Sequence, residues 1–469
     1  MPSLVSVASG ADLRARRWDA VVLGSGIAGL VAAARLGMAG HRVLVVQEEA
    51  AATAFEGLRE PFLLAGARDA GVLDACMREL TLPLIDRRRV VPTPIAYQMV
   101  GPDLRADLGE GDLTADELVA WGLAVPDEAR ALVRTLVEAA EAEREVLLRS
   151  PVVRMGRART RDPLRALVRT PPANTRARGL PDQAASPPAA LAPVLDAQVR
   201  ALSNLASDPP PPEARARLLG TPLSGGAGFV DGPPWLSGLL RRRVESLYGE
   251  FRTLSGDFSL VTADGLPGIV PGDSRDLWLG RLLVIAAPAS ALAAVLDPDE
   301  RPDFLRARPE PRHCRRWVAV HLRVQRSVLP EAMAPRVIVL DGPGRSPLTL
   351  SSFANRQEPE LSDWVARAVA PADADPAAVQ KAIFQRVLEL LPFSEGAVTR
   401  RPVQIPRWDD DGWLEDPSPG TGWPGESDLR VSTRPPVYRL DRPSVASLGL
   451  EGDLLLGWRG GDAIAAALR

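Results

Sequence analysis

Three glycines near the start of the chain have the spacing that binds a diphosphate. Gly24-Ser25-Gly26-Ile27-Ala28-Gly29 has the pattern GxGxxG. In this pattern the first glycine allows a tight turn, the second lets a pyrophosphate approach the backbone, and the third lets a helix pack against a strand. Unpaired N–H groups and a partial positive charge at the start of the helix then hold the phosphates. We therefore predict that these six residues contact a dinucleotide.

The residues on either side of the glycines predict a complete βαβ unit. Asp19–Leu23 is a short apolar run that ends at glycine, as a buried parallel strand does. Ile27–Met38 is rich in alanine and leucine and ends before Gly40, which indicates a helix, and Arg42–Val46 is the second strand. A lone GxGxxG is weak evidence, but one between a strand and a helix is specific. The alternative is a glycine-rich turn in an α/β fold that binds no nucleotide.

The side chain that should hold the adenosine ribose is altered. An acidic residue belongs at the end of the second strand, roughly 20 residues past the glycines. That position is Gln47, and Glu48 follows it on the opposite face, because side chains alternate along a strand. A neutral hydrogen bond contributes about 1 kcal/mol and a charged one roughly 1.5–3 kcal/mol, so we expect affinity to fall on the order of tenfold. Gln47 and Glu48 remain candidate cofactor contacts.

Few other side chains have the type and spacing of catalytic groups. His313, Cys314 and His321 surround the strand-like run Arg316–Val324, where a histidine serves either as a base near neutral pH or as a structural hydrogen-bond partner. The sequence has no HExxH motif, nucleophile elbow or metal-spaced cluster, so we predict no metal site. The two cysteines, Cys76 and Cys314, are far apart, which predicts reduced thiols.

The overall composition excludes several classes of protein. A length of 469 residues is too great for one core and predicts two or three domains. The net charge of −3 gives no basic field for nucleic acid. Met1–Arg17 lacks the apolar core of a signal peptide, and Ala20–Ala34 is too short to span a bilayer. We expect a cytoplasmic protein, with peripheral membrane contact and the oligomeric state left open.

The rest of the chain predicts mixed strands and helices. Thr170–Pro212 is rich in Pro, Ala and Ser and predicts a loop or hinge. Periodicity and turn residues predict the following elements: a hairpin at Val90–Val100 and Leu104–Leu108; helices at Pro126–Arg149, Pro234–Tyr248, Ala291–Leu296 and Ala377–Leu391; strands at Gly256–Ala263, Trp278–Ala287, Arg316–Val324 and Ala334–Leu340; a last buried strand at Gly452–Gly457 and a final helix at Gly460–Arg469.

Asp19–Val46 resembles the opening of the FAD-dependent superfamily of phytoene desaturases, protoporphyrinogen oxidases and flavin amine oxidases. Three later segments agree with it. Gly225-Gly226 resembles the glycine pair at the return from the substrate domain, and Leu282–Ala289 resembles a strand and proline turn close to the cofactor. Leu454–Leu468 looks like a shortened C-terminal flavin motif, in which a glycine loop and a helix start approach the flavin ring.

The resemblance implies FAD as the cofactor and adds contacts to those of the glycine loop, Gln47 and Glu48. The added residues are Ala287, Pro288, Gly460, Gly461, Asp462 and Ala463. Trp458 directly follows the predicted last strand and either borders the flavin site or has a packing role. Two departures accompany Gln47, because Glu49–Gly57 has one glycine where members carry a glycine pair, and the C-terminal motif is trimmed. In such enzymes the flavin transfers the hydride and the protein orients the substrate, so the resemblance names no catalytic residue.

The position of the lysine affects which substrate class is predicted. Flavin amine oxidases of this superfamily usually carry a lysine near the flavin, and the only lysine, Lys381, lies in a predicted amphipathic helix where a solvated position is expected. This favours desaturation or oxidation of an apolar, isoprenoid-like molecule over amine oxidation. The alternatives are a non-catalytic flavin- or nucleotide-binding relative, which the altered positions favour, and an NAD(P)-dependent dehydrogenase, which leaves the C-terminal segment unexplained.

The predicted architecture is an α/β protein with a discontinuous FAD-type Rossmann domain and an inserted mixed α+β substrate domain. The predicted bounds are a tail at 1–15, an FAD-binding domain at 16–70, 220–300 and 440–469, and a substrate domain at 71–219 and 301–439.

Overall fold

A computed structural model describes most of the chain. The described residues are 4–6, 13–49, 71–149, 152–155, 187–210, 212–229, 234–272, 274–306, 315–340, 346–355, 357–403, 406–408, 412–414, 416, 427–440 and 442–468. His313, Cys314, nearly all of Glu49–Gly57 and much of the Pro-rich segment lie outside these ranges, so the predictions for them are not examined by the structure.

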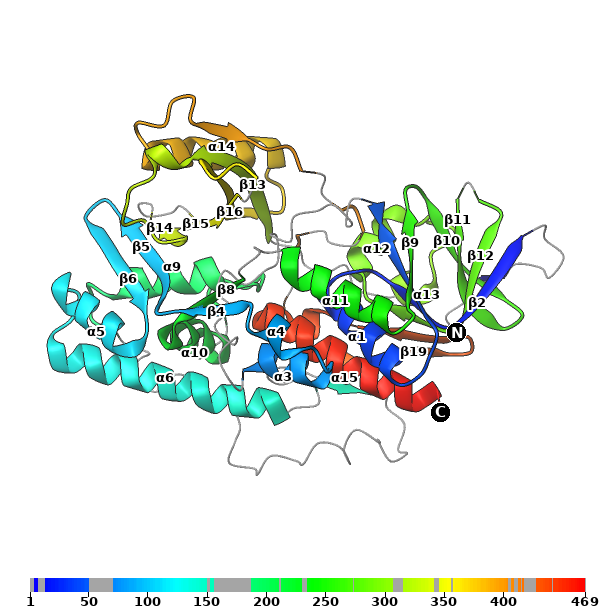
Figure 1. Ribbon diagram of the computed structural model, residues 1–469. Coiled ribbons are helices and arrows are strands. Elements are labelled where there is room, and N and C mark those ends of the chain that lie inside the picture. Colours follow the sequence, from blue (N-terminus) through cyan, green and yellow to red (C-terminus); the bar gives the residue numbers. More distant parts are fainter. Residues whose placement is uncertain are drawn as a thin grey trace.

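A nine-stranded sheet forms one side of the molecule (Figure 1). Its strands are β1 (Val5–Ser6), β2 (Arg14–Leu23), β3 (Val43–Glu48), β9 (Glu250–Leu254), β10 (Phe258–Ala263), β11 (Leu266–Pro271), β12 (Asp276–Ile285), β19 (Arg430–Thr433) and β20 (Pro436–Arg439). β12, β2, β3 and β9 are neighbours in that order and parallel, and β20 is parallel to β12. Leu23 pairs with Val46 and with Ile285, so these strands end at one edge of the sheet.

Helices cover both faces of the parallel strands. Ala20 and Val22 face a core shared with α1 (Ile27–Met38), α3 (Val72–Glu79), α11 (Pro234–Ser246) and α15 (Leu450–Leu468). Val21 and Leu23 face a second core with α12 (Ala289–Val295) and α13 (Asp303–Arg306). The alternation explains why the strand is a continuous apolar run, since both of its faces are buried.

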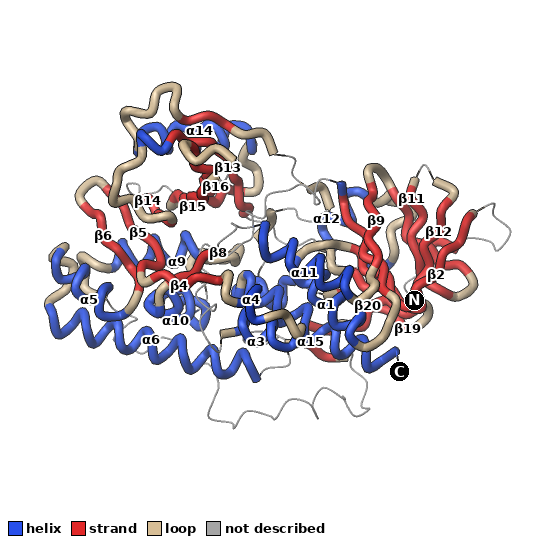
Figure 2. The backbone as a smooth tube through the Cα atoms, in the orientation of Figure 1, coloured by secondary structure: helices blue, strands red, loops and turns tan. Residues whose placement is uncertain are grey.

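A seven-stranded sheet lies in the other half (Figure 2). Its order is β17 (Val398–Arg400), β13 (Arg315–Gln325), β16 (Leu361–Pro371), β15 (Leu348–Ala354), β14 (Arg336–Val339), β5 (Ile95–Gly101) and β6 (Leu104–Gly109). α14 (Pro376–Leu390) packs on one face and is capped by Asp375, whose carboxylate accepts from the N–H groups of Ala377 and Ala378. A separate core joins the β5–β6 and β14 side to four further helices: α5 (Gly111–Ala120), α6 (Pro126–Arg149), α9 (Ala192–Leu202) and α10 (Pro212–Gly220).

Several short elements complete the described chain. They are α4 (Leu84–Arg87), the 3-10 turns η2 (Thr221–Ser224), η3 (Arg326–Val328) and η4 (Arg442–Leu448), the ribbon of β4 (Val90–Thr93) with β8 (Gly226–Phe229), and the pair β7 (Val153–Arg154) with β18 (Ser427–Asp428). None of the helices in the described ranges has the length and apolar character that crossing a membrane requires.

The predicted end of the chain is wrong. Gly452–Gly457 is not a strand, because a single helix, α15, runs from Leu450 to Leu468 and includes Gly460 and Gly461. A short apolar run such as Leu454–Leu456 is buried equally well on a helix, and periodicity alone does not separate the two. The parallel strand beyond β12 is instead β20. β1 and β19–β20 also join the nine-stranded sheet, although the predicted bounds place them outside its domain; the bounds stay a prediction.

Candidate functional site

The loop after β2 is bonded directly to the loop after β12. The N–H groups of Ala286 and Ala287 both donate to the Leu23 carbonyl, at 2.8 and 3.0 Å. Gly24 has φ +112°, and a Cβ on it would lie 2.7 Å from the Ala287 nitrogen. Only glycine allows this approach. It places Ala287 and Pro288 beside the glycine loop, and their contact with a cofactor stays a prediction.

The other two glycines of the loop have different surroundings. A Cβ on Gly29 would lie 2.4 Å from the Gly24 carbonyl oxygen, so Gly29 is needed for the packing of α1 on its own loop. A Cβ on Gly26 would meet nothing within 4 Å, and Gly26 is exposed. α1 also has no side-chain cap and no acidic residue in its first turn. Within the described residues the start of α1 is therefore uncovered, and its first-turn N–H groups have no side-chain cap, which fits the binding of a diphosphate.

Gln47 is occupied by the protein's own side chains. Its Oε1 accepts two hydrogen bonds from the Arg241 guanidinium, at 2.9 and 3.2 Å, and its Nε2 donates to Thr253 Oγ1 at 3.3 Å. Arg241 is held in place over the Phe251 ring, 3.9 Å from its centroid. The position that should hold the ribose is thus filled by a contact between β3, α11 and β9.

Glu48 points to the other face of the sheet, as strand alternation predicted. Its Oε2 accepts from the backbone N–H groups of Arg407 and Trp408, at 2.7 and 2.9 Å. Trp408 is buried and packs edge-on against Phe258. The Glu48 carboxylate therefore anchors a distant segment of chain over the end of β3, and its contacts give it a structural role.

The C-terminal glycines serve helix packing. A Cβ on Gly457 would lie 2.5 Å from the Ala28 carbonyl oxygen, and a Cβ on Gly461 would lie 3.0 Å from Ala32 Cα. Small residues four positions apart let α15 lie directly against α1, and the two helices run in the same direction. The expected glycine loop at the flavin ring is absent from this helix, so Gly461 is buried between helices instead.

The remaining predicted contacts lie along the same helix. Asp462 forms an ion pair with Arg35 Nε on α1 at 2.5 Å, and Gly460 lies against Leu440. Ala463 and Trp458 are buried in the core shared with α1. Trp458 lies in the middle of α15 and does not directly follow a strand, which corrects the prediction. These side chains point to packing roles, and their contact with a cofactor stays a prediction.

The start of α15 extends beyond the start of α1. Gly457 is level with Ala28, so the seven residues back to Leu450 carry α15 about 10 Å past the glycine loop at 1.5 Å per residue. Its first turn contains Glu451 and Asp453, whereas the first turn of α1 contains no acid. Acidic groups there already balance the positive end of α15, so α1 offers the better site for an anion.

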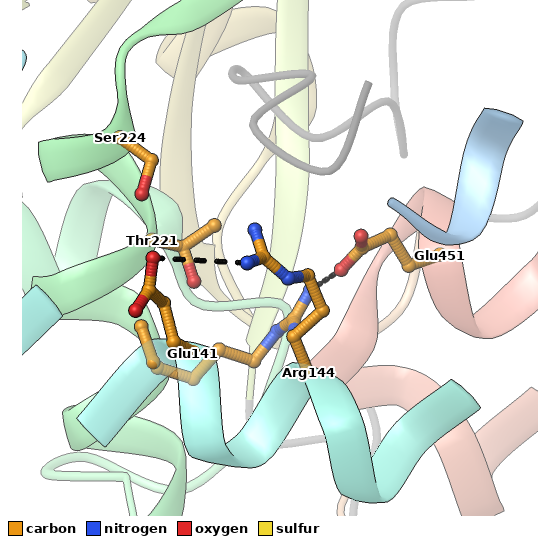
Figure 3. Close-up of a pocket in the computed structure, with 7 residues that line it drawn as sticks. Glu141, Arg144, Thr221, Ser224 and Glu451 are labelled. Atoms are coloured by element: carbon orange, nitrogen blue, oxygen red, sulfur yellow. Dashed lines mark hydrogen bonds and ion pairs between the residues drawn. The ribbon is translucent and has the colours of Figure 1, made fainter. Parts of the chain in front are cut away.

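A small polar pocket lies at this end of α15 (Figure 3). Its volume is about 20 Å³, room for about one water molecule. Glu451 pairs with the buried Arg217 of α10, and Arg144 of α6 lies 3.8 Å from Glu141. Burial lowers the pKa of Arg217, and Glu143 opposes this shift. The pocket is lined by Ala140, Glu141, Arg144, Arg217, Thr221, Ser224 and Glu451.

No motif or local pattern in the sequence predicts this pocket or Arg241. Arg217 and Glu451 are 234 positions apart, and neither stands in a motif. Only the packing of α6, α10 and η2 around the start of α15 brings them together.

Four further residues of the sequence prediction can be placed. Lys381 is exposed on α14, the helix that covers the outer face of the seven-stranded sheet in Figure 1. Burial, together with Arg401, lowers the pKa of His321 to about 4, which makes it a weaker base near neutral pH than predicted. Gly225-Gly226 leads into strand β8 and not directly into a helix.

Comparison with known proteins agrees with this geometry. Residues 19–57 match a family model described as an FAD binding domain. Cyclohexylamine oxidase from Brevibacterium oxydans IH-35A has a TM-score of 0.54 at 15% identity, covering 96% of this chain and 99% of that one. Putrescine oxidase, solved with putrescine, has a TM-score of 0.54 at 12% identity, covering 97% and 100%.

A third solved structure is an oxidoreductase from Methanosarcina mazei, with a TM-score of 0.52 at 14% identity, covering 93% of this chain and 99% of that one. Among curated protein sequences, none matches this chain. The matches confirm the predicted α/β fold over nearly the full length of the chain, and the family match falls on the predicted glycine loop.

Proposed function

We propose that this chain, which has the fold of the FAD-dependent oxidoreductase superfamily, is an FAD-dependent enzyme that oxidises or desaturates an apolar small molecule. The open start of α1 carries the proposal: Gly26 faces free space in a loop whose other glycines are needed for packing. The family match over residues 19–57 supports FAD as the dinucleotide.

The chain's own residues would bind and orient the groups that react. The N–H groups at the start of α1 hold the pyrophosphate, and Ala287 and Pro288 border it from the loop after β12. When bound, FAD supplies the two-electron chemistry that the side chains lack. We place the substrate near the face of the seven-stranded sheet opposite α14, where Val365 is a buried apolar residue; Ile338 on the same face packs into the core with α5, α6, α9 and α10.

Oxidation of an apolar substrate, isoprenoid-like in character, is favoured by the position of Lys381. This lysine is exposed on the outer helix α14, away from the glycine loop. The amine substrates named for two of the similar structures are properties of those proteins. We also propose a cytoplasmic location, because Cys76 is a free buried thiol, as is usual in a reducing compartment.

The first experiment tests the cofactor. Purified protein should show flavin absorbance, and heating should release free FAD. Gly26→Val should lower FAD content at least tenfold with little change in melting temperature, because its Cβ enters open space needed by the diphosphate. Gly256→Val is the matched control, since Gly256 is also exposed with nothing within 4 Å. A colourless protein that added FAD does not stabilise would instead indicate a non-catalytic relative.

The second experiment tests the substrate. Anaerobic bleaching of the bound flavin is measured with polyene and isoprenoid alcohols, and with cyclohexylamine and putrescine. Faster bleaching by the apolar panel is expected. Faster bleaching by the two amines would replace the proposed reaction with amine oxidation.

A further inference from the structure

Arg336 is a half-buried cation that pairs with no acidic side chain among the described residues. It is the first residue of β14. Its Nη1 donates to the Ala227 carbonyl at 2.6 Å and its Nη2 donates to Thr93 Oγ1 at 3.1 Å, and both acceptors are neutral. Burial lowers the pKa of Arg336 to about 10 with no charged group contributing. Within the described residues, no carboxylate lies at ion-pair distance from this guanidinium.

Such an arrangement is costly unless an anion completes it. A guanidinium has five N–H donors, and burying an unpaired charge costs several kcal/mol. Elsewhere the protein avoids this cost, since the buried Arg217 is paired with Glu451. An anion held by the planar fork of Arg336 would supply the missing charge.

The position of Arg336 places it on the face of the sheet proposed for the substrate. Val337 and Val339 belong to the core under α14, so Arg336 and Ile338 face the opposite side. Arg336 pairs with Ser351, Ser351 with Val365, and Val365 with His321, which gives one row across four strands.

The neighbouring row on this face has the same mixed character. Ile338 pairs with Thr349, and Thr349 pairs with Arg367. Ile338, Thr349 and Arg367 are all buried, so the half-buried side chains of these two rows are Arg336, Ser351 and His321 of the first row.

A short segment joins Arg336 to the pocket at the start of α15. Ser224 lines that pocket, and Ala227, three residues later, accepts the hydrogen bond from Arg336. A Cβ on Gly226 would lie 3.1 Å from Arg336 Nη1, so the glycine makes room for the guanidinium. Gly226, one of the glycine pair that the sequence singled out, thus makes room for Arg336 where β14 meets the β4–β8 ribbon.

We propose that Arg336 binds the anionic group, carboxylate or phosphate, of a substrate that is otherwise apolar. This rests on the proposed function and narrows its substrate class to amphiphilic acids. The diphosphate of the cofactor is a second anion that a guanidinium binds. The experiment distinguishes binding of the cofactor's diphosphate from binding of a substrate anion.

Binding is measured by calorimetry on flavin-free protein with octanoate, octyl phosphate and, as the neutral probe, octanol. Wild type should bind the two anions at least tenfold more tightly than octanol, as expected for charge-assisted hydrogen bonds. Arg336→Met should abolish this preference, leave octanol binding unchanged, and retain FAD content. Its melting temperature should be kept or raised, because an apolar residue of similar length replaces an unpaired charge.

Two more variants keep the result interpretable. Arg323→Met is the matched control, because Arg323 lies on the same sheet but already pairs with Glu358 at 3.0 Å and Asp363 at 3.7 Å, so the preference for anions should persist. Arg336→Lys keeps the charge without the fork and should retain part of the preference. If Arg336→Met fails to fold, the anion preference of Arg336→Lys is compared with that of wild type instead.

Three results would overturn the proposal. Equal binding of octanoate and octanol by wild type would make Arg336 a structural clamp on β4 and β8. An unchanged anion preference in Arg336→Met would place the anion elsewhere. Loss of FAD from that variant, with octanoate binding intact, would assign Arg336 to the cofactor's phosphates. The calorimetry uses flavin-free protein, so its outcome does not depend on whether FAD is the cofactor. Whether FAD is the cofactor is read separately, from the colour of the purified enzyme.

Discussion

The glycine loop and the end of β3 lie at the same edge of the same sheet, yet they differ in what they leave for a ligand. The loop is built from backbone, and Gly26 leaves the start of α1 open. The end of β3 is built from side chains, and both Gln47 and Glu48 are taken by partners within the protein. One edge of the sheet thus has two kinds of position: a helix start that stays uncovered within the described residues, and a strand end whose polar side chains are used in structural contacts.

The largest effect is expected inside the loop, where a glycine packs against backbone. Gly29→Val should destabilise the protein by roughly 3 kcal/mol or more, because its Cβ would lie 2.4 Å from the Gly24 carbonyl oxygen and backbone must shift. The melting temperature and the FAD content should fall together. A variant that melts like wild type would show that the loop is less tightly packed than described.

The next effect is expected at Glu48 and should be structural alone. Glu48→Ala leaves the buried N–H groups of Arg407 and Trp408 without their acceptor, at a cost of about 2–3 kcal/mol. Chemical denaturation measures the loss, and FAD affinity at a temperature where the fold is intact should stay within twofold. A tenfold loss of FAD would make Glu48 a cofactor contact after all.

A smaller effect is expected from restoring the acid at the end of β3. Gln47→Glu combined with Arg241→Gln should raise FAD affinity about tenfold, because a charged acceptor freed from its arginine becomes available to the ribose. Gln47→Glu alone should gain less, since Arg241 would neutralise the new carboxylate. Titration of flavin-free protein with FAD measures both. Equal gains in the two variants would contradict the view that Arg241 blocks this position.

The smallest effect is expected from removing Gln47 altogether. Gln47→Ala should change FAD affinity less than twofold, because the amide is already bound by Arg241 and Thr253. Stability should fall by about 1 kcal/mol for the lost hydrogen bonds. An affinity loss of tenfold in the same titration would return Gln47 to the ribose.

The sequence predicts the backbone features of this molecule better than its side-chain contacts. The tight turn at Gly24 and the close packing at Gly29 agree with the spacing, because glycine spacing encodes a backbone shape directly, and the phosphate contact of Gly26 stays a prediction. The helix Pro126–Arg149 was predicted with its observed bounds from its proline start and its periodicity.

Long-range contacts were not predictable in this way. The partners of Gln47 and Glu451, Arg241 and Arg217, are each about 200 positions away and carry no local pattern. The last helix was mistaken for a strand and a helix because Gly457, Gly460 and Gly461 suggest breaks. In a solvent-exposed helix glycine is unfavourable, and only contact with α1 makes it useful here.

The contact between α1 and α15 also has a consequence for how the protein is made. Ala28 and Ala32 are covered by Gly457 and Gly461, which the ribosome adds more than 400 residues later. Until α15 has been synthesised, the face of α1 that contains Ala28 and Ala32, next to the glycine loop, is not covered by it. We expect chaperones to protect that surface during synthesis, and cofactor loading to follow the arrival of the last helix.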